Sequence, residues 1–221
     1  MSDTNPMLYR LQGVSRDFRL DKGVVHVLSG LNLEIPEGCW CALVGRSGSG
    51  KTTLLQLLGG LDRPTGGTIL YRGEDLGRMS SSRLTTLRRR EFGFVFQSYH
   101  LLPELTAWEN AALPALGWLE NRQEAYDRAR KMLVEFGLEA RLNHRPPELS
   151  GGEQQRVAIA RALIHNPAVI LADEPTGNLD EASAKVVVGI FQRLHKEQGK
   201  TIVMVTHDPD IAAMAEIRHR L

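Results

Sequence analysis

The sequence predicts an α/β fold in which short buried strands alternate with helices. Three apolar runs, at residues 40–44, 168–172 and 201–205, have the length and continuous apolar character of strands inside a parallel sheet. A glycine-rich loop follows the first run, and a helical pattern follows the loop. The chain has 221 residues, which is enough for one α/β domain with a small inserted subdomain.

Composition excludes several classes of protein. The apolar content of 42% and the charged content of 24% are ordinary for a soluble globular chain. A net charge of +1 argues against a polyelectrolyte binder, so we expect no nucleic-acid partner. No apolar run is long enough to cross a bilayer, and residues 1–10 lack the apolar core of a signal peptide. We therefore expect a cytoplasmic chain that only a partner could hold at a membrane.

The first forty residues are predicted to form a small antiparallel sheet. Residues 8–20 and 24–28 have the pattern of two strands around a turn at 21–23, and residues 31–35 alternate as a further strand. Phe18 lies in this sheet. Its ring either packs against the sheet or offers a surface on which adenine can stack.

The glycine-rich loop carries the phosphate-binding pattern G-x-x-x-x-G-K-[ST]. Its glycines would let backbone N–H groups approach phosphate oxygens at the positive end of the following helix. Lys51 would reach the β- and γ-phosphates, and the hydroxyl of Thr52 would ligate Mg²⁺. The alternative is a tight turn without a ligand. The predicted phosphate-binding residues are Gly45, Arg46, Ser47, Gly48, Ser49, Gly50, Lys51, Thr52 and Thr53.

The middle of the chain is predicted to hold a strand at 68–71, a helix through residue 90 and a strand at 91–96. Gln97 directly follows the last strand, and ligand contacts collect at such positions in α/β proteins. The helix carries a basic run that is either a solvated face or a contact for lipid headgroups or an acidic partner loop. This run consists of Arg83, Arg88, Arg89 and Arg90.

An apolar segment follows at residues 98–119, with helical turns around 106–113. Part of it could belong to the core or to a docking surface for another protein. The residues in question are Tyr99, Leu101, Leu102 and Pro103.

A second helix start has features suited to an anion. Residues 122–136 are predicted to form an amphipathic helix that ends at Gly137. Within the stretch 149–163, Ser150 is a candidate N-cap, two glycines follow it, and a longer helix is predicted after the cap. This helix is either simply capped or presents its N-terminus to a ligand.

Polar residues follow the two central strands. Asp173 and Glu174 come directly after the run at 168–172, where adjacent carboxylates are costly unless a cation or a substrate uses them. A helix is predicted at 181–196. His207 follows the run at 201–205 and is either packed or catalytic.

Together these motifs resemble the nucleotide-binding subunit of an ABC transporter, over about residues 8–215. The most specific motif is LSGGEQ at 149–154, which is similar to the family signature. Phe18 is similar by position to the aromatic residue of the A-loop, although phenylalanine replaces the commoner tyrosine. The remaining motifs come in the family's order: Walker A at 45–52, the Q-loop glutamine Gln97, Walker B at 170–174, the D-loop at 178–180 and the switch histidine His207.

The resemblance implies the ABC ATPase form of the P-loop NTPase fold, in a single nucleotide-binding domain at 1–221. It implies a mixed-sheet core at about 1–97 and 162–221, an N-terminal antiparallel sheet and a helical signature subdomain at about 98–161. It also implies a head-to-tail homodimer in which each ATP lies between one chain's phosphate loop and the other's signature. The two helix starts would then hold the phosphates from opposite sides.

The resemblance further implies Mg²⁺-dependent ATP hydrolysis, mainly by positioning and charge neutralisation. Thr52, Gln97 and Asp173 would hold the ion, and Lys51 would offset phosphate charge. Glu174 would deprotonate the attacking water, and His207 would link Glu174 to the γ-phosphate. The opposite chain would close the site with its signature and D-loop residues: Ser150, Gly151, Gly152, Glu153 and Asp180.

The segments GLDRPTGG, YHLLPELTAWENAALP, PTGNLD and VTHD are similar to one branch of the family. This branch includes the lipoprotein-releasing ATPase LolD, to which the pattern is most similar, the macrolide-efflux protein MacB and the division protein FtsE. It implies an FtsX-, MacB- or LolC-like permease, docked in a groove lined from residue 98 to 105 that includes Tyr99, Leu101, Leu102 and Pro103, and a location on the cytoplasmic face of the inner membrane. An FtsE-like signalling role without transport stays open, and the sequence names no substrate.

Two other classes fit less well. ABC ATPases that act on DNA or ribosomes carry long insertions or two cassettes, and neither occurs in this chain. Small-molecule P-loop kinases lack the LSGGEQ segment.

Overall fold

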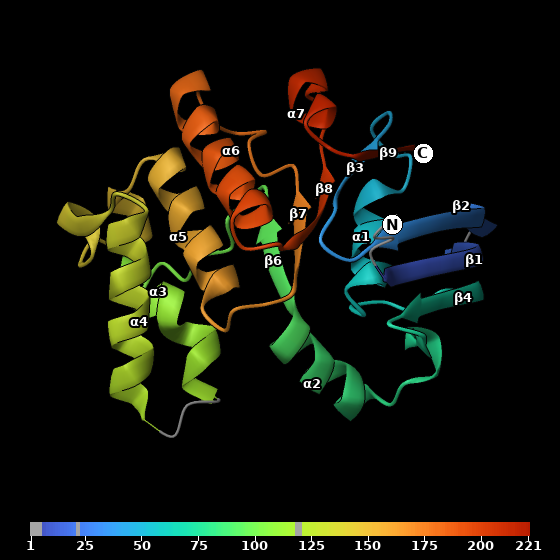
Figure 1. Ribbon diagram of the computed structural model, residues 1–221, viewed down its shortest axis with the longest axis horizontal. Helices are drawn as coiled ribbons and strands as arrows, with labels where there is room; N and C mark the ends of the chain where they lie inside the picture. Colours follow the sequence, from blue (N-terminus) through green and yellow to red (C-terminus); the bar gives the residue numbers. More distant parts are fainter. Residues whose placement is uncertain (1–5, 21–22, 118–120) are drawn as a thin grey trace, which may run out of the picture.

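The computed structural model describes residues 6–20, 23–117 and 121–221. Two sheets stand side by side, with helices on both faces of the larger sheet and a helical group at its far edge (Figure 1). The turn predicted at 21–23 lies mostly outside the described residues.

The smaller sheet is antiparallel and has the strand order β2-β1-β4-β5. The prediction of two strands at 24–28 and 31–35 is wrong in detail, because they form one strand. Bulges absorb the intervening residues: the N–H of Gly30 donates to the Ser15 hydroxyl, and the N–H of Gly13 donates to the Asn32 side chain. The strands are β1 (Met7–Leu20), β2 (Gly23–Pro36), β4 (Gly66–Tyr71) and β5 (Glu74–Asp75).

The larger sheet is parallel and has the order β6-β7-β8-β3-β9. Its three central strands are the three apolar runs of the sequence, and they are buried on both faces. The edge strand β9 was not predicted, since its IRHR segment lacks an apolar run. The strands are β3 (Trp40–Val44), β6 (Phe92–Phe96), β7 (Val169–Asp173), β8 (Thr201–Val205) and β9 (Ile217–Arg220).

Successive residues of the parallel strands point to opposite faces of the sheet and pack in a different hydrophobic core on each face. Cys41 and Leu171 pack with the antiparallel sheet and the helix α1 (Lys51–Leu58). Ala42 and Ile170 pack on the other face, which is covered by α5 (Gly151–Leu163), α6 (Glu181–Lys196) and α7 (Pro209–Ala213). The short helix α7 was not predicted from the sequence. Figure 1 shows α5 and α6 to the left of β7 and β8, and α7 at the upper end of β8.

A third core lies among α5 and the two helices α3 (Ala107–Ala112) and α4 (Arg122–Glu135). The helix α2 (Ser81–Glu91) leads into β6, with Ser80 as its N-cap. Four short 3₁₀ segments complete the described helices: Leu76–Arg78, Leu113–Gly117, Glu139–Arg141 and Pro146–Glu148. The fold class is that predicted, whereas the division of the chain at 97 and 161 stays a prediction. Among the described residues, none of the helices has the length and apolar character needed to span a bilayer.

Candidate functional site

The segments singled out in the sequence meet at one edge of the parallel sheet. The phosphate loop follows β3, the acidic pair ends β7, and His207 follows β8, which pairs with both. Gln97 follows β6, whose last residue pairs with Asp173. Because the strands are parallel, their carboxyl ends lie together, and polar groups from distant parts of the sequence become neighbours.

The phosphate loop adopts a shape that depends on glycine. Gly50 has φ 93°, a left-handed conformation that side-chain-bearing residues rarely adopt. A Cβ atom there would stand 2.9 Å from the carbonyl oxygen of Val27 in β2. The helix α1 begins at Lys51, directly after this glycine, so its first N–H groups open onto the loop.

Lys51 is almost buried, with 6% of its surface exposed. Its ammonium donates to two carbonyl oxygens of its own loop, those of Gly45 at 3.1 Å and Arg46 at 2.7 Å. An ammonium group has three donors, so one remains for a ligand. The loop therefore holds a positive charge in a fixed place.

The first carboxylate of the acidic pair lies beside the start of α1. The hydroxyl of Thr52 is near enough to Asp173 to favour its charged form. Burial raises the pKa of Asp173 above its ordinary value, and the neighbouring charge of Glu174 adds to the rise, while the Thr52 hydroxyl and the Lys51 charge oppose it. A partly buried carboxylate next to a hydroxyl is suited to a hard cation.

The second carboxylate faces the phosphate loop. Glu174 has φ 44°, and its N–H donates to the carbonyl oxygen of Val205 at 3.0 Å. The Nδ1 atom of His207 lies 3.3 Å from the Oε2 atom of Glu174. A cavity of about 220 Å³ brings the carboxylate and the loop together; it is lined by Val27, Ser47, Gly48, Gly50, Lys51, Thr52, Thr53 and Glu174.

Gln97 lies at the same edge but contacts a different segment. Its amide donates to the Asn178 side chain at 3.1 Å, and the Asn178 amide donates back to the Gln97 carbonyl oxygen at 3.2 Å. A Cβ atom at Gly177 would stand 2.9 Å from the Gln97 amide nitrogen. The Q-loop is thus tied to the D-loop, and the role of Gln97 toward a metal stays a prediction.

The second helix start is a capping box. Ser150 accepts from the N–H of Glu153, and the Glu153 carboxylate accepts from the N–H of Ser150 at 2.8 Å. Arg141 holds the same carboxylate at 3.0 Å. Ser150 itself is exposed, and the two glycines after it pack closely against the D-loop side of the molecule.

Close packing explains both signature glycines. A Cβ atom at Gly152 would stand 2.4 Å from the Ser183 hydroxyl, and one at Gly151 would stand 2.9 Å from the Tyr99 hydroxyl. Asp180 caps α6 by accepting from the N–H and the hydroxyl of Ser183, and these bonds lower the pKa of Asp180. The signature and D-loop of one chain therefore touch each other.

The structure assigns different surroundings to the four residues of the apolar loop. Leu101 packs against the third core, and the Tyr99 side chain lies beside the signature. Leu102 and Pro103 are exposed. Arg161 of α5 donates to the carbonyl oxygens of Tyr99 and His100 at 2.6 and 2.5 Å and so fixes the loop. A docking role for these residues stays a prediction.

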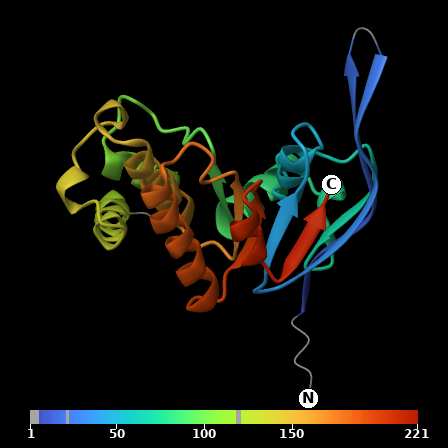
Figure 2. The same cartoon turned by 90° about the horizontal axis from the view of Figure 1, so that it is seen from above.

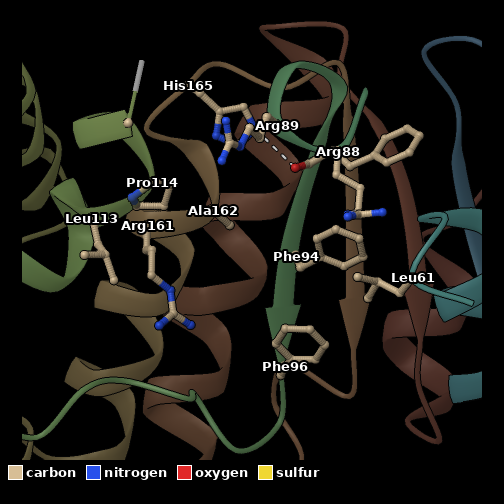
Figure 3. A pocket seen from close by; sticks show the side chains of 12 residues that line it. Leu61, Arg88, Arg89, Phe94, Phe96, Leu113, Pro114, Arg161, Ala162 and His165 are labelled. Carbon is tan, nitrogen blue, oxygen red and sulfur yellow. Dashed lines mark hydrogen bonds between the residues drawn. The ribbon is translucent and has the colours of Figure 1, made fainter. Parts of the chain in front are cut away.

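A separate groove of about 510 Å³ opens beside this loop (Figure 3). Leu61, Phe94 and Phe96 lie on one side of it, and Leu113, Pro114 and Arg161 lie on the other. Three arginines of the groove, Arg88, Arg89 and Arg161, add positive charge, and no described residue that lines it carries a carboxylate. Burial lowers the pKa of His165.

Three contacting residues escaped the sequence analysis: Val27, Gln155 and Arg161. The Gln155 amide is buried and donates to the Pro175 carbonyl oxygen at 2.6 Å, which joins the signature helix to the segment after Glu174. Its position on the buried face of an amphipathic helix is the signal that could have identified it. Val27 offers no such signal, because its contact with the loop depends on tertiary packing.

Comparison with known proteins gives concordant results. A family model described as ABC transporter matches residues 28–177. The lipoprotein-releasing system ATP-binding protein LolD of Chromohalobacter salexigens is 47% identical over 209 residues, which are 95% of this chain and 88% of that protein. The macrolide export ATP-binding/permease protein MacB 1/2 of Paracoccus denitrificans is 49% identical over 217 residues, 97% of this chain and 32% of that protein. The chain therefore spans about a third of the length of the MacB relatives it matches.

Solved structures agree with these matches. The dimeric post-hydrolysis structure of the ATP-binding cassette MJ0796, bound to ADP and Pi, superposes with a TM-score of 0.90. The two chains are 39% identical, and the match covers 97% of this chain and 94% of that one. The phosphate loop, acidic pair, histidine and signature thus lie in a fold that relatives share along nearly the whole chain. The chain belongs to the ABC transporter family, as an ATP-binding cassette.

Proposed function

We propose that the chain is the ATP-hydrolysing motor subunit of a transporter and drives an FtsX-like permease of the LolD or MacB kind. The observation that carries the proposal is the cavity at the start of α1, which Lys51 and Glu174 both line. A buried ammonium and open helix N–H groups suit a triphosphate, and the carboxylate opposite suits an attacking water. The identity with LolD over most of both chains supports the branch.

The chain's own groups divide the chemistry among them. Lys51 and the loop amides offset the charge of the β- and γ-phosphates. Glu174 accepts the proton of the attacking water, and His207, 3.3 Å away, orients that carboxylate. Asp173 and Thr52 are neighbours and offer the oxygen ligands that Mg²⁺ prefers, so they would hold the ion. Bound there, the ion would neutralise charge on the phosphates.

A second copy of the chain completes the site. Ser150 is exposed, and the cavity around Lys51 is lined by described residues that do not include the signature. The N-terminus of α5, which is suited to phosphate, is therefore exposed on the surface of a single chain. The MJ0796 cassette is dimeric with ADP and Pi bound, which supports a head-to-tail dimer with ATP between the two chains.

The groove of Figure 3 is the proposed docking site for the permease. It lies beside the Q-loop, its walls are apolar, and its basic groups suit a partner segment with acidic or neutral ends. Phe96 lines the groove and directly precedes Gln97. A partner bound in the groove can therefore affect the position of Gln97 at the active-site edge of the sheet. Docking at this surface would hold the chain on the cytoplasmic face of the inner membrane.

A charge placed in the groove is expected to release the chain from its permease. Leu61 is 49% exposed and lines the groove, so Leu61→Asp changes the surface and not the core. Pull-down from membranes with an FtsX-like permease should retain the wild-type chain and lose this variant, while ATP binding by the isolated chain survives. Leu102→Asp tests the apolar loop in the same way.

Val134→Asp is the matched control, because Val134 is also an exposed apolar residue but lies on α4, outside the groove. Retention of Leu61→Asp at the wild-type level would mean that the permease does not dock in this groove. If the wild-type chain is retained by no permease of this type and its turnover is unchanged when the two are reconstituted together, the motor role itself fails.

A further inference from the structure

The long β1–β2 ribbon lies against the phosphate loop at Val27 and Leu28. Arg16 pairs with Leu28 and Asp17 pairs with His26, so Val27 has no residue opposite it and forms a β-bulge. A Cβ atom at Gly50 would stand 3.0 Å from Cγ1 of Val27 and 2.9 Å from its carbonyl oxygen. The bulge thus directs Val27 onto the loop, and the rest of the ribbon extends beyond it (Figure 2).

Phe18 lies a short way past this contact. It pairs with Val25, which is two residues from Val27, and two residues of strand span about 7 Å. The ring is therefore displaced from the phosphate loop along the ribbon by a distance suited to the ribose and base of a nucleotide. Phe18 is half-buried, so part of the ring is open to a ligand.

Arg16 covers one face of this ring. Its guanidinium carbon lies 4.2 Å from the centroid of the Phe18 ring, within the range of a cation–π contact. Its Nε atom donates to Asp62 at 2.8 Å, and Nη1 donates to the carbonyl oxygen of Asp17 at 3.3 Å. The ion pair is well shielded, with side chains 19% and 28% exposed. Asp62 lies just after α1, so the guanidinium is held from the same helix that begins at the phosphate loop.

We infer that Arg16, fixed by Asp62, is a positioning residue for the adenine of ATP. The guanidinium occupies one face of the Phe18 ring and leaves the other face for the base, so that base, ring and cation stack in that order. The planar guanidinium suits this role better than an ammonium does. The inference rests on the proposal that the site binds ATP and that Phe18 contacts its base.

The test compares binding of MgATP with binding of magnesium tripolyphosphate, which has the phosphates but no base. Arg16→Ala is expected to weaken ATP binding about two- to fivefold and to leave tripolyphosphate binding unchanged, because only the base contacts the ring. Arg16→Lys keeps the charge and the ion pair, and its affinity for ATP is expected to lie between those of the wild type and Arg16→Ala. Arg19→Ala removes the same charge from an exposed position on the same strand and should change neither affinity.

The Phe18→Ala variant distinguishes the contact of Phe18 with the base from the role of Arg16. If it leaves ATP affinity unchanged, Phe18 does not contact the base and the proposed platform fails. If Phe18→Ala weakens ATP binding but Arg16→Ala does not, the platform stands and the role of Arg16 is overturned. Equal weakening of ATP and tripolyphosphate by Arg16→Ala would also overturn it, since the effect would then be a general distortion of the ribbon.

Discussion

Glu174→Gln is expected to lower ATP hydrolysis by about 10²–10⁴-fold, the usual cost of losing a general base. The amide keeps the size and the hydrogen-bonding reach of the carboxylate but cannot accept the proton of the attacking water. Binding should survive, because Lys51 and Thr52 on the other side of the cavity are untouched. Removing one negative charge near the γ-phosphate should even favour the bound state.

The measurement is turnover of purified protein at saturating MgATP, with nucleotide affinity determined separately. Glu181→Gln is the matched control: this carboxylate is 84% exposed at the start of α6 and pairs with Lys185 at the surface. It should hydrolyse ATP at the wild-type rate. Near-normal turnover by Glu174→Gln would remove the catalytic assignment and leave the carboxylate a structural group.

Lys51→Ala is expected to abolish measurable hydrolysis, with a loss of at least about 10²–10³-fold, and to weaken ATP binding as well. The ammonium offsets phosphate charge, and its loss also frees the carbonyl oxygens of Gly45 and Arg46 that now accept from it. Both effects disturb the loop that would hold the phosphates. The loss should therefore appear in affinity and in rate, unlike that of Glu174→Gln.

Lys185→Ala is the control for Lys51, since it removes a lysine that is 76% exposed and paired with Glu181. Thermal unfolding of both variants distinguishes a misfolded loop from a missing charge. Turnover of Lys51→Ala close to that of the wild type would mean that the glycine-rich loop is not a phosphate-binding loop in this chain.

The buried strands and the ends that carry the chemistry were predictable from the sequence. The runs at 168–172 and 201–205 are apolar throughout, and this pattern is characteristic of strands covered on both faces. Parallel strands bring their carboxyl ends together, so Asp173, Glu174 and His207 could be expected near the phosphate loop. The cap at Ser150 was equally predictable, because local side-chain chemistry determines it.

Contacts that depend on three-dimensional packing were not predictable. The pair of amides at Gln97 and Asn178 joins residues 81 positions apart, and either amide could have bonded to water instead. The strand β9 carries alternating charged residues and is recruited to the sheet edge by β3, without an apolar run of its own. Val27 touches the phosphate loop only because a bulge redirects the strand.

The central claim is that two chains share each ATP, and the Glu174→Gln protein tests it most directly. Because this variant should bind ATP without consuming it, it should run as a dimer on size exclusion with ATP and as a monomer with ADP. Adding Ser150→Arg should abolish the dimer, since Ser150 is exposed at the signature and a bulky side chain there would block the γ-phosphate contact. A Glu174→Gln protein that binds ATP but stays monomeric would contradict the shared site.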